Sequence, residues 1–278
     1  MRLTCGPFAV DLSTPVVMGV LNVTPDSFSD GGHWFDPVRA IDRAVEMVEE
    51  GAAFIDVGGE STRPGAATVP VDEELRRVIP LVEALAGRLT VPVSIDTRKP
   101  EVMRAAIAAG ATLVNDIAAL GAAGALEAVA GSGAAVCLMH MQGEPRSMQA
   151  APDYHDVVAE VVAYLQDRAA ACVAAGIAHE RVVLDPGFGF GKLLEHNLDL
   201  LAGLDRLAAL GFPVMAGLSR KSMIGQVTGR PVGERLAGSV ALATLAALGG
   251  ARIIRAHDVA ATVDAAKIAA ALAARQGR

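Results

Sequence analysis

The chain has 278 residues, of which 52% are hydrophobic, 4% aromatic and 20% charged, and its formal net charge is −7. This composition excludes a disordered chain and argues against non-specific binding to nucleic acid or to an anionic membrane. Because aromatic residues are scarce, the core must consist mainly of Ala, Val, Leu and Ile, and the length is enough for one or two domains.

A regular alternation of strands and helices is predicted along the chain. The first dozen residues, with Gly6-Pro7 between two apolar runs, predict a small β-hairpin. The segments that follow have helical spacing, as at Ile41, Val45 and Val48, and alternate with short β-prone runs. These runs are Val16–Leu21, Phe54–Val57, Val91–Ile95, Thr112–Val114, Ala135–Met139, Val182–Leu184, Val214–Gly217 and Arg252–Ile254. Because the runs are continuously apolar, they indicate parallel strands that are covered on both faces.

Two α/β architectures compete for this pattern. A doubly wound sheet usually has fewer strands, and a dinucleotide-binding sheet would have G-x-G-x-x-G after its first strand, where this chain has Asn22-Val-Thr-Pro. A TIM (β/α)8 barrel of about 250 residues matches both the number of strands and the length. No linker or shift in composition divides the chain. We therefore predict one domain, residues 1–278, with a (β/α)8 barrel and a short N-terminal β-hairpin.

The sequence offers no sign of export or of a membrane anchor. Residues 1–15 include Asp11 and lack a continuous apolar stretch, so we expect no signal peptide. The longest uncharged apolar stretch, Leu236–Ala251, is too short and too rich in Gly, Ser and Thr to span a bilayer. Three cysteines without a CxxC pair predict neither a disulfide scaffold nor a zinc site. We expect a cytoplasmic protein with no nucleic-acid or membrane partner.

Each predicted strand ends in a polar or charged group. A single such residue is more commonly a helix cap or a turn residue, but barrel strands all end at one mouth, where active sites lie. Eight polar strand ends therefore indicate a site. In chain order they are Asn22; Asp56 with Glu60, Ser61, Thr62 and Arg63; Asp96; Asn115 and Asp116; His140; Asp185; Ser219, Arg220 and Lys221; and Arg255 and His257.

The chemistry of these groups falls into two sets. Asp96 and Asp185 end buried strands and need hydrogen-bond donors, which an amino-heterocycle would supply, while Asn115 can both donate and accept. Asn22 is able to complete a loosely held Mg²⁺ that takes its other ligands from water and phosphate. A cationic set suits a phosphate or diphosphate and comprises Arg63, Arg220, Lys221, Arg255 and His257.

Other motifs point to no further chemistry. Gly187–Lys192 has the wrong spacing for a P-loop, and no G-x-S-x-G elbow surrounds Ser219. His140 has no partners at zinc-site spacing and is flanked by methionines that suit a pocket lining. Lysine is rare in this Arg-rich chain, so Lys221 at a strand end indicates a need for a compact ammonium.

The strand-end motifs resemble those of the bacterial dihydropteroate synthase family over nearly the whole chain. Ala256 is a small departure, because the family more often has Val there. The matching segments are VLNVTPDSFSDGG (20–32), DVGGESTRPG (56–65), SIDT (94–97), VNDI (114–117), LMHMQ (138–142), DPGFGFGK (185–192), GLSRKS (217–222) and IRAHD (254–258). The resemblance implies a TIM-barrel transferase of folate biosynthesis. It would join 6-hydroxymethyl-7,8-dihydropterin diphosphate to p-aminobenzoate in an SN1-like, Mg²⁺-assisted reaction that yields 7,8-dihydropteroate and diphosphate.

The resemblance also implies roles for individual residues. The pterin would be held by Asp96, Asn115, Asp185, Lys221, Met139 and Gly217. The diphosphate would be held by Asn22 (with Mg²⁺), Thr62, Arg63, Arg255 and His257. The p-aminobenzoate pocket, which in this family also receives sulfonamide inhibitors, would comprise Phe28, Pro64, Phe190, Ser219 and Ser222. The implied catalytic residues are Lys221, Arg255, His257, Arg63 and Asp30, the last by holding the loops Thr24–Phe35 and Ser61–Thr68 closed. A homodimer through outer helices near Leu236–Leu248 is also implied.

Two alternatives share the pterin-holding residues. A methyltetrahydrofolate-type methyltransferase domain has the same barrel but no need for the anion sites around Lys221 and Arg255. A non-catalytic pterin-binding paralogue would keep Asp96 and Asp185 while losing lid or diphosphate groups. The full set of diphosphate-binding residues in this chain favours the synthase.

The scarce aromatic residues support a second substrate. Five of the ten fall in two glycine-bearing segments that are typical of loops, at Phe28, Trp34, Phe35, Phe188 and Phe190. Buried aromatics usually belong to helices and strands, so this placement needs another explanation. We expect Phe28 and Phe190 to flank an arylamine, and the other three to anchor their loops.

Overall fold

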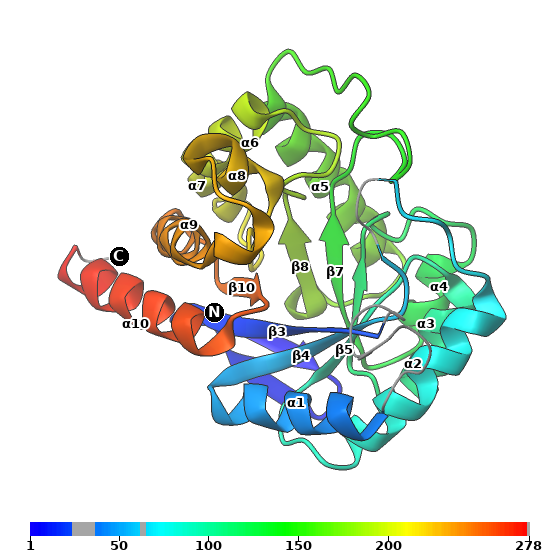
Figure 1. The fold of residues 1–278 in the computed structure, drawn as a ribbon. Helices are drawn as coiled ribbons and strands as arrows, with labels where there is room; N and C mark the ends of the chain where they lie inside the picture. The colour runs from blue at the N-terminus through cyan, green and yellow to red at the C-terminus, as the bar shows by residue number, and fades with distance from the viewer. Residues whose placement is uncertain (24–36, 62–64, 277–278) are drawn as a thin grey trace.

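The computed structural model describes residues 1–23, 37–61 and 65–276, and within them eight parallel strands form a barrel (Figure 1). The order of hydrogen-bonded neighbours is β8-β7-β6-β5-β4-β3-β10-β9. A bridge between Leu184 and Val214 joins β8 to the segment that leads into β9 and closes the barrel. The strands are β3 (Val16–Asn22), β4 (Ala52–Gly58), β5 (Val93–Asp96), β6 (Leu113–Asp116), β7 (Ala135–Met139), β8 (Val182–Asp185), β9 (Met215–Gly217) and β10 (Ile253–Ala256).

Helices cover the outside of the barrel (Figure 1). Their apolar faces pack on outward-facing strand residues such as Ile55, Val57 and Ile95, all fully buried. The helices are α1 (Pro37–Glu49), α2 (Val71–Ala86), α3 (Pro100–Ala108), α4 (Ala125–Ala130), α5 (Val157–Ala174), α6 (Leu194–Ala202), α7 (Leu204–Ala208), α8 (Ser222–Thr228), α9 (Leu236–Leu248) and α10 (Val259–Arg275). Among the described residues, no helix is both long and apolar enough to cross a membrane.

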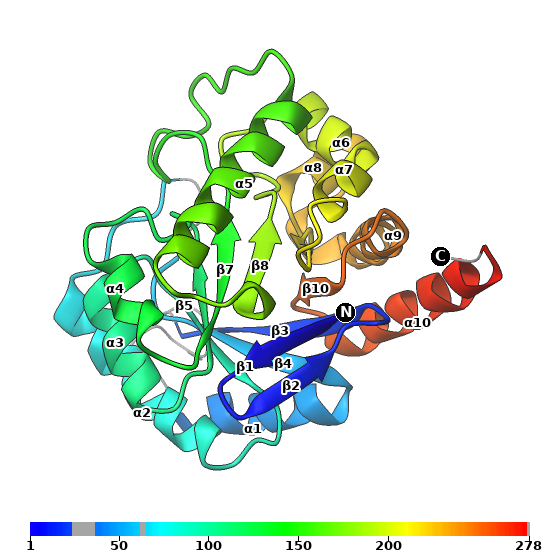
Figure 2. The same ribbon diagram turned by 180° about the vertical axis from the view of Figure 1, so that it is seen from behind.

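The predicted hairpin is confirmed and closes one end of the barrel. Strands β1 (Arg2–Cys5) and β2 (Phe8–Asp11) pair antiparallel, and Figure 2 shows them in front of the barrel strands. Leu3, Cys5 and Leu12 are fully buried in a cluster with residues from the barrel interior. The Gly6 N–H donates to the Gly133 carbonyl at 2.8 Å, which ties the turn to the loop before β7. The polar mouth must therefore be the opposite end.

The barrel is also confirmed, with differences at the strand ends. β5, β6 and β8 include their terminal polar residues Asp96, Asp116 and Asp185, which the apolar pattern alone left outside. The reason is that neighbouring strands pair through the backbone, as at Asp96 opposite Asn115, whatever the side chain. All three cysteines lie in described segments and are free, buried thiols.

Candidate active site

The inward-facing residues of the barrel change from apolar to polar along the strands. Near the hairpin they are apolar, as at Phe54 and Leu113, which belong to the buried cluster under the barrel. Two residues further along the same strands lie Asp56 and Asn115, also buried. Because side chains alternate between the two faces of a strand, residues two apart point the same way. The polar groups therefore converge inside the barrel at the carboxyl ends of the strands.

A guanidinium lies between two carboxylates at the centre of this polar layer. Arg255 Nε donates to Asp56 Oδ2 at 2.7 Å, and its Nη2 donates to Asp96 Oδ2 at 2.8 Å. Asn115 Nδ2 also donates to Asp56 Oδ2, at 3.1 Å. Burial raises the pKa of Asp96 to about 7, against the attraction of Arg255 and with repulsion from Asp56, Asp116 and Glu74. Sequence reasoning placed Arg255 with the diphosphate groups, but here it lies among the residues predicted to hold the pterin.

The second predicted pterin carboxylate, Asp185, lies in the field of a lysine at the barrel mouth. Asp185 Oδ1 accepts the Gly187 N–H at 2.7 Å, and burial raises the pKa of Asp185 against the pull of the Lys221 charge. Lys221 Nζ donates to the Phe188 carbonyl and lies 4.7 Å from the centre of the Phe190 ring. Burial lowers the pKa of Lys221 to about 8, and the charge of Asp185 opposes this. Lys221 thus lies between the predicted pterin and p-aminobenzoate residues.

An open space lies between these charged groups. A Cβ built on Gly217 would lie 3.9 Å from both Lys221 Nζ and Arg255 Cβ, so the missing side chain leaves open the space between the two cations. Met139 ends β7 opposite Asp185 and is buried. A flat heterocycle placed between Met139 and Gly217 would have the carboxylates at its edge.

Ser219, which was predicted to line the arylamine pocket, contacts His257, which was predicted to bind the diphosphate. Ser219 Oγ lies 3.1 Å from His257 Nδ1 and accepts the His257 N–H at 3.2 Å. Ser222 is exposed at the first residue of α8. Asn22 ends β3, and a Cβ on the neighbouring Gly58 would lie 3.5 Å from its Oδ1.

Two strand-end groups, Asp116 and Arg220, have structural partners instead. Asp116 accepts the N–H groups of Ala118 and Leu120 at 2.7 and 2.8 Å, which makes it a turn-forming residue. Arg220, grouped above with the phosphate-suited cations, forms a bidentate pair with Asp258 at 3.0 and 2.5 Å. These two therefore follow the ordinary interpretation of a polar strand end.

His140 is also explained by a structural partner, a lysine that sequence reasoning gave no role. Lys192 Nζ donates to the carbonyls of His140, Gly187 and Phe190 at 3.3, 3.0 and 3.0 Å, and lies 3.0 Å from His140 Nδ1. Burial lowers the pKa of Lys192 to about 7 and that of His140 to about 3. Because the imidazole is neutral, Nδ1 accepts from the ammonium. Lys192 thus fixes the loop that carries Phe190.

Glycine makes that loop possible. A Cβ on Gly187 would lie 1.9 Å from the His140 carbonyl oxygen, and one on Gly191 would lie 2.2 Å from that of Gln142; both glycines have positive φ. The backbone of the loop after β8 therefore packs directly against the backbone of the segment after β7. Phe188 is fully buried in the core, so a loop aromatic is a core residue here, while Phe190 stays half-buried beside Lys221.

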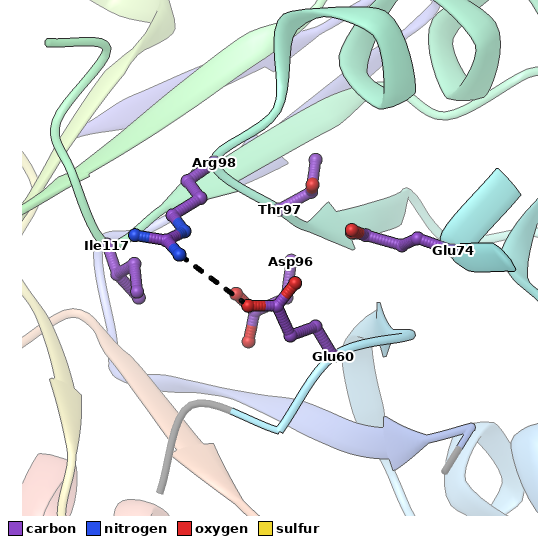
Figure 3. Close-up of a pocket in the computed structure, with 6 residues that line it drawn as sticks. All are labelled: Glu60, Glu74, Asp96, Thr97, Arg98 and Ile117. Carbon is purple, nitrogen blue, oxygen red and sulfur yellow. Dashed lines mark ion pairs between the residues drawn. The ribbon is translucent and has the colours of Figure 1, made fainter. Parts of the chain in front are cut away.

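A small acidic pocket adjoins the mouth on the β5 side. Its cavity of about 10 Å³ has room for about one water molecule. Figure 3 shows the ion pair between Arg98 and Glu60, which are 3.8 Å apart, with Glu74 pointing in from α2. The residues that line it are Glu60, Glu74, Asp96, Thr97, Arg98 and Ile117.

The structure brings together most, but not all, of the predicted set. Asp56 is a residue whose role sequence reasoning missed, although its position two residues after buried Phe54 was a visible signal. Several predicted residues lie outside the described part of the chain: Phe28, Asp30, Thr62, Arg63 and Pro64, together with Trp34 and Phe35.

Known proteins of one family match the chain over most of its length. A family model described as "Pterin binding enzyme" matches residues 18–257. The dihydropteroate synthase of Escherichia coli (strain K12) is 54% identical, over 100% of this chain and 99% of that protein. The Haemophilus influenzae synthase is 50% identical, over 96% and 98%.

Solved structures give the same result. The chain is similar to Yersinia pestis dihydropteroate synthase in a sulfonamide drug complex, with a TM-score of 0.94 and 52% identity over 99% of this chain and 100% of that one. It is also similar to the Burkholderia cenocepacia enzyme complexed with 7,8-dihydropteroate, with a TM-score of 0.89 and 51% identity over 100% and 98%.

Proposed function

The chain belongs to the family of pterin-binding enzymes, as a dihydropteroate synthase, and from this premise we propose how its own residues carry out the transfer. The reaction joins the methylene carbon of 6-hydroxymethyl-7,8-dihydropterin diphosphate to the amino nitrogen of p-aminobenzoate. It yields 7,8-dihydropteroate and diphosphate, so the enzyme is a transferase of folate biosynthesis. The observation that carries the proposal is the convergence of Asp96, Asn115, Asp185 and Lys221 at one barrel mouth.

The pterin lies against the buried carboxylates. Asp96 and Asp185 accept from its ring N–H and amino groups, and Asn115 provides both a donor and an acceptor. The ring fills the space that Gly217 leaves open, with Met139 on its other side. The donors of the pterin take the place that Arg255 Nη2 occupies on Asp96, so pterin binding releases that part of the guanidinium toward the diphosphate.

Departure of the diphosphate is helped by positive charge. The C–O bond of the methylene breaks, and its electron pair leaves with the diphosphate. Arg255 and His257 stabilise that charge, together with Thr62 and Arg63, whose roles rest on the family resemblance. The arylamine nitrogen then forms the new bond to the methylene carbon and loses one proton to water. Lys221, beside the ring, holds the pterin during this step.

Asn22 fits a Mg²⁺ ion. Its amide oxygen is a hard ligand at the end of β3, and among the described residues no group of three or more His, Cys, Asp or Glu is placed to hold a metal. An ion there would take its remaining ligands from the diphosphate and water. When bound, Mg²⁺ supplies charge that neutralises the diphosphate.

The arylamine pocket lies next to the pterin. Phe190 and Ser219 line it, Ser222 lies at its rim, and Phe28 and Pro64 are assigned to it by the family resemblance. Because Lys221 lies over the Phe190 ring, the two substrate pockets share a wall. We expect the same pocket to accept sulfonamides, as the related Yersinia pestis enzyme is in complex with such a drug.

Assembly and location complete the proposal. Apolar side chains on α9 and α10 are half exposed, with 53% for Leu245 and 65% for Ile268, and the two helices lie side by side (Figure 1). This surface favours a homodimer through these helices. We place the enzyme in the cytoplasm.

One assay tests the function. The protein is mixed with the pterin diphosphate, p-aminobenzoate and Mg²⁺, and dihydropteroate is detected by mass spectrometry. We expect product from the wild type and loss of turnover in Lys221→Ala. Absence of product, or undiminished turnover in both Lys221→Ala and Arg255→Ala, would contradict the proposal. The methyltransferase domain and the non-catalytic paralogue would then be the remaining interpretations.

A further inference from the structure

A buried ammonium outside the substrate pockets joins three parts of the barrel rim. Lys99 Nζ donates to Glu60 Oε2, to Glu74 Oε2 and, at 2.7 Å, to the Val69 carbonyl. Glu60 follows β4, Glu74 is in the first turn of α2, and Lys99 lies three residues after Asp96 at the end of β5. We refer to Glu60, Val69, Glu74 and Lys99 as the Lys99 clamp.

The Lys99 clamp buries charged groups, and this burial opposes the stability of the fold. The side chains of Lys99, Glu60 and Glu74 are only 16%, 13% and 1% exposed. Glu74 Oε1 is buried and has no hydrogen-bond partner among the described residues. Removing such charges from water costs free energy that apolar side chains of the same size would not, so a buried ion cluster is weak evidence for stability. The clamp therefore needs another reason.

The choice of lysine points the same way. Of 24 basic residues only Lys99, Lys192, Lys221 and Lys267 are lysines. Lys192 and Lys221 lie at the active site, where each Nζ donates to backbone carbonyls. Lys99 is the third lysine whose ammonium donates to a backbone carbonyl, here that of Val69. An ammonium with three donors on a flexible stem suits this task better than a planar guanidinium.

The clamp fixes both ends of the segment between β4 and α2. At its start, Glu60 is bound by Lys99, and Arg77 Nη1 donates to the Gly59 carbonyl at 3.1 Å. At its end, Val69 gives its carbonyl to Lys99 and its N–H to Glu60 Oε2 at 3.3 Å. One ammonium thus ties residues 60 and 69 to each other and to the strand end that carries Asp96.

We propose that Lys99 is a positioning residue for the diphosphate substrate, because it ties both ends of segment 59–69 to the end of β5. That segment contains Thr62 and Arg63, so this inference rests on the diphosphate-binding roles proposed for them above. Lys99 touches no substrate. Its effect is to give the diphosphate-binding segment fixed end points beside the pterin carboxylate Asp96, which lines the same small pocket as Glu60 and Glu74 (Figure 3).

The test compares two ligands that differ only in the diphosphate. Dissociation constants of Lys99→Met are measured by calorimetry for 6-hydroxymethyl-7,8-dihydropterin diphosphate with Mg²⁺ and for 6-hydroxymethyl-7,8-dihydropterin, which lacks the diphosphate. We expect about tenfold weaker binding of the first and unchanged binding of the second, with a matching rise in KM for the pterin diphosphate. Arg43→Met is the matched control, because it removes a partly buried cation that pairs with Glu46 of α1 and with Glu50, and none of these three residues is assigned to a substrate.

A second variant separates positioning from folding. Lys99→Met leaves Glu74 without its cation and Glu60 with Arg98 alone, at 3.8 Å. Lys99→Met/Glu74→Gln therefore restores the charge balance and is expected to recover Tm without recovering diphosphate affinity. The proposal is overturned if Lys99→Met binds both ligands like the wild type. It is also overturned if affinity for both ligands falls together and returns with Tm in the double variant. A wild type that forms no product fails the proposed function, whereas an active wild type with an unaltered Lys99→Met fails only this inference.

Discussion

The two halves of the barrel interior, one next to the hairpin and one at the mouth, differ in the polarity of their side chains. On five strands, residues two positions apart change from apolar to polar or to an open glycine: Phe54 and Asp56, Leu113 and Asn115, Val183 and Asp185, Met215 and Gly217, and Ile253 and Arg255. The first residue of each pair belongs to the lower half, which packs with the hairpin, and the second belongs to the upper half, which faces the mouth. One step of the strand pleat therefore divides the residues that stabilise the barrel from those that bind ligand.

The upper half carries charges that the fold alone does not favour. Burial raises the pKa of Asp96 to about 7 and lowers that of Lys221 to about 8, so each charged form is held at a cost. The buried cluster of the lower half consists of apolar side chains and the thiols of Cys5 and Cys137, and the one buried hydroxyl that the described strands add there is Ser94, two positions before Asp96. We therefore expect substitutions in the two halves to change different quantities.

The largest effect is expected from Asp96→Asn. The amide keeps the shape but removes the carboxylate that receives the pterin donors, and two charge-assisted hydrogen bonds amount to about 4 kcal/mol, or roughly a 10³-fold loss of kcat/KM. Arg255 keeps its bond to Asp56, so the free energy of unfolding should change by less than about 1 kcal/mol. Steady-state kinetics and urea unfolding measure the two quantities. A large loss of stability with little loss of activity would show that Asp96 supports the fold and not the binding of the pterin.

The opposite pattern is expected from Leu3→Ala in the hairpin. Its side chain is fully buried under the barrel, and truncation should cost about 3 kcal/mol of unfolding free energy. KM for both substrates should stay at the wild-type value, because the cavity forms at the far end of the strands. Val10→Ala, on a less buried hairpin residue, is the control and should cost less. If KM changed for Leu3→Ala, the two halves would not be independent.

An intermediate effect is expected in the pH dependence of kcat/KM. Asp96 accepts donors only as a carboxylate, so activity should rise as pH passes about 7, and Lys221 donates only as an ammonium, so activity should fall above about 8. Asp56, Asp116 and Glu74 raise the pKa of Asp96, and Arg255 lowers it. Glu74→Gln removes one repulsive charge and should move the acidic limb to lower pH. An acidic limb that stays in place or moves upward would contradict this electrostatic account.

The smallest effect is expected from Arg220→Ala at the rim. The Arg220 side chain is 46% exposed and pairs with Asp258, and such exposed pairs contribute about 0 to 1 kcal/mol. Both kcat/KM and stability should stay close to wild type, in contrast to the neighbouring Lys221. A loss of activity comparable to that of Lys221→Ala would show that Arg220 leaves Asp258 to bind substrate.

The sequence was sufficient to predict the barrel and the hairpin because β-prone runs recur at regular spacing and each strand is continuously apolar. It was also sufficient to place Asp96, Asn115, Asp185 and Lys221 at one mouth, since parallel strands share an end. It could not distinguish Asp116, whose bonds to Ala118 and Leu120 form a local turn, from a ligand-binding carboxylate.

Contacts between distant residues were beyond sequence reasoning. Arg255 meets Asp56 and Asp96 across 199 and 159 residues of chain, and only closure of the barrel brings the guanidinium to those carboxylates. The burial of Phe188 and the carbonyl cage around Lys192 likewise follow from how the loop after β8 packs on the segment after β7. The roles of Phe28, Asp30, Thr62, Arg63 and Pro64 stay predictions.

The division of the barrel is tested most directly on one strand, with Val183→Ala and Asp185→Asn measured side by side for unfolding free energy and for dihydropteroate formation. The two residues belong to β8 and point into the same barrel two positions apart. We predict that Val183→Ala lowers stability by about 2 kcal/mol with unchanged kcat/KM. Asp185→Asn should lower kcat/KM at least about 100-fold with little change in stability. Parallel losses of stability and activity in both variants would contradict the account.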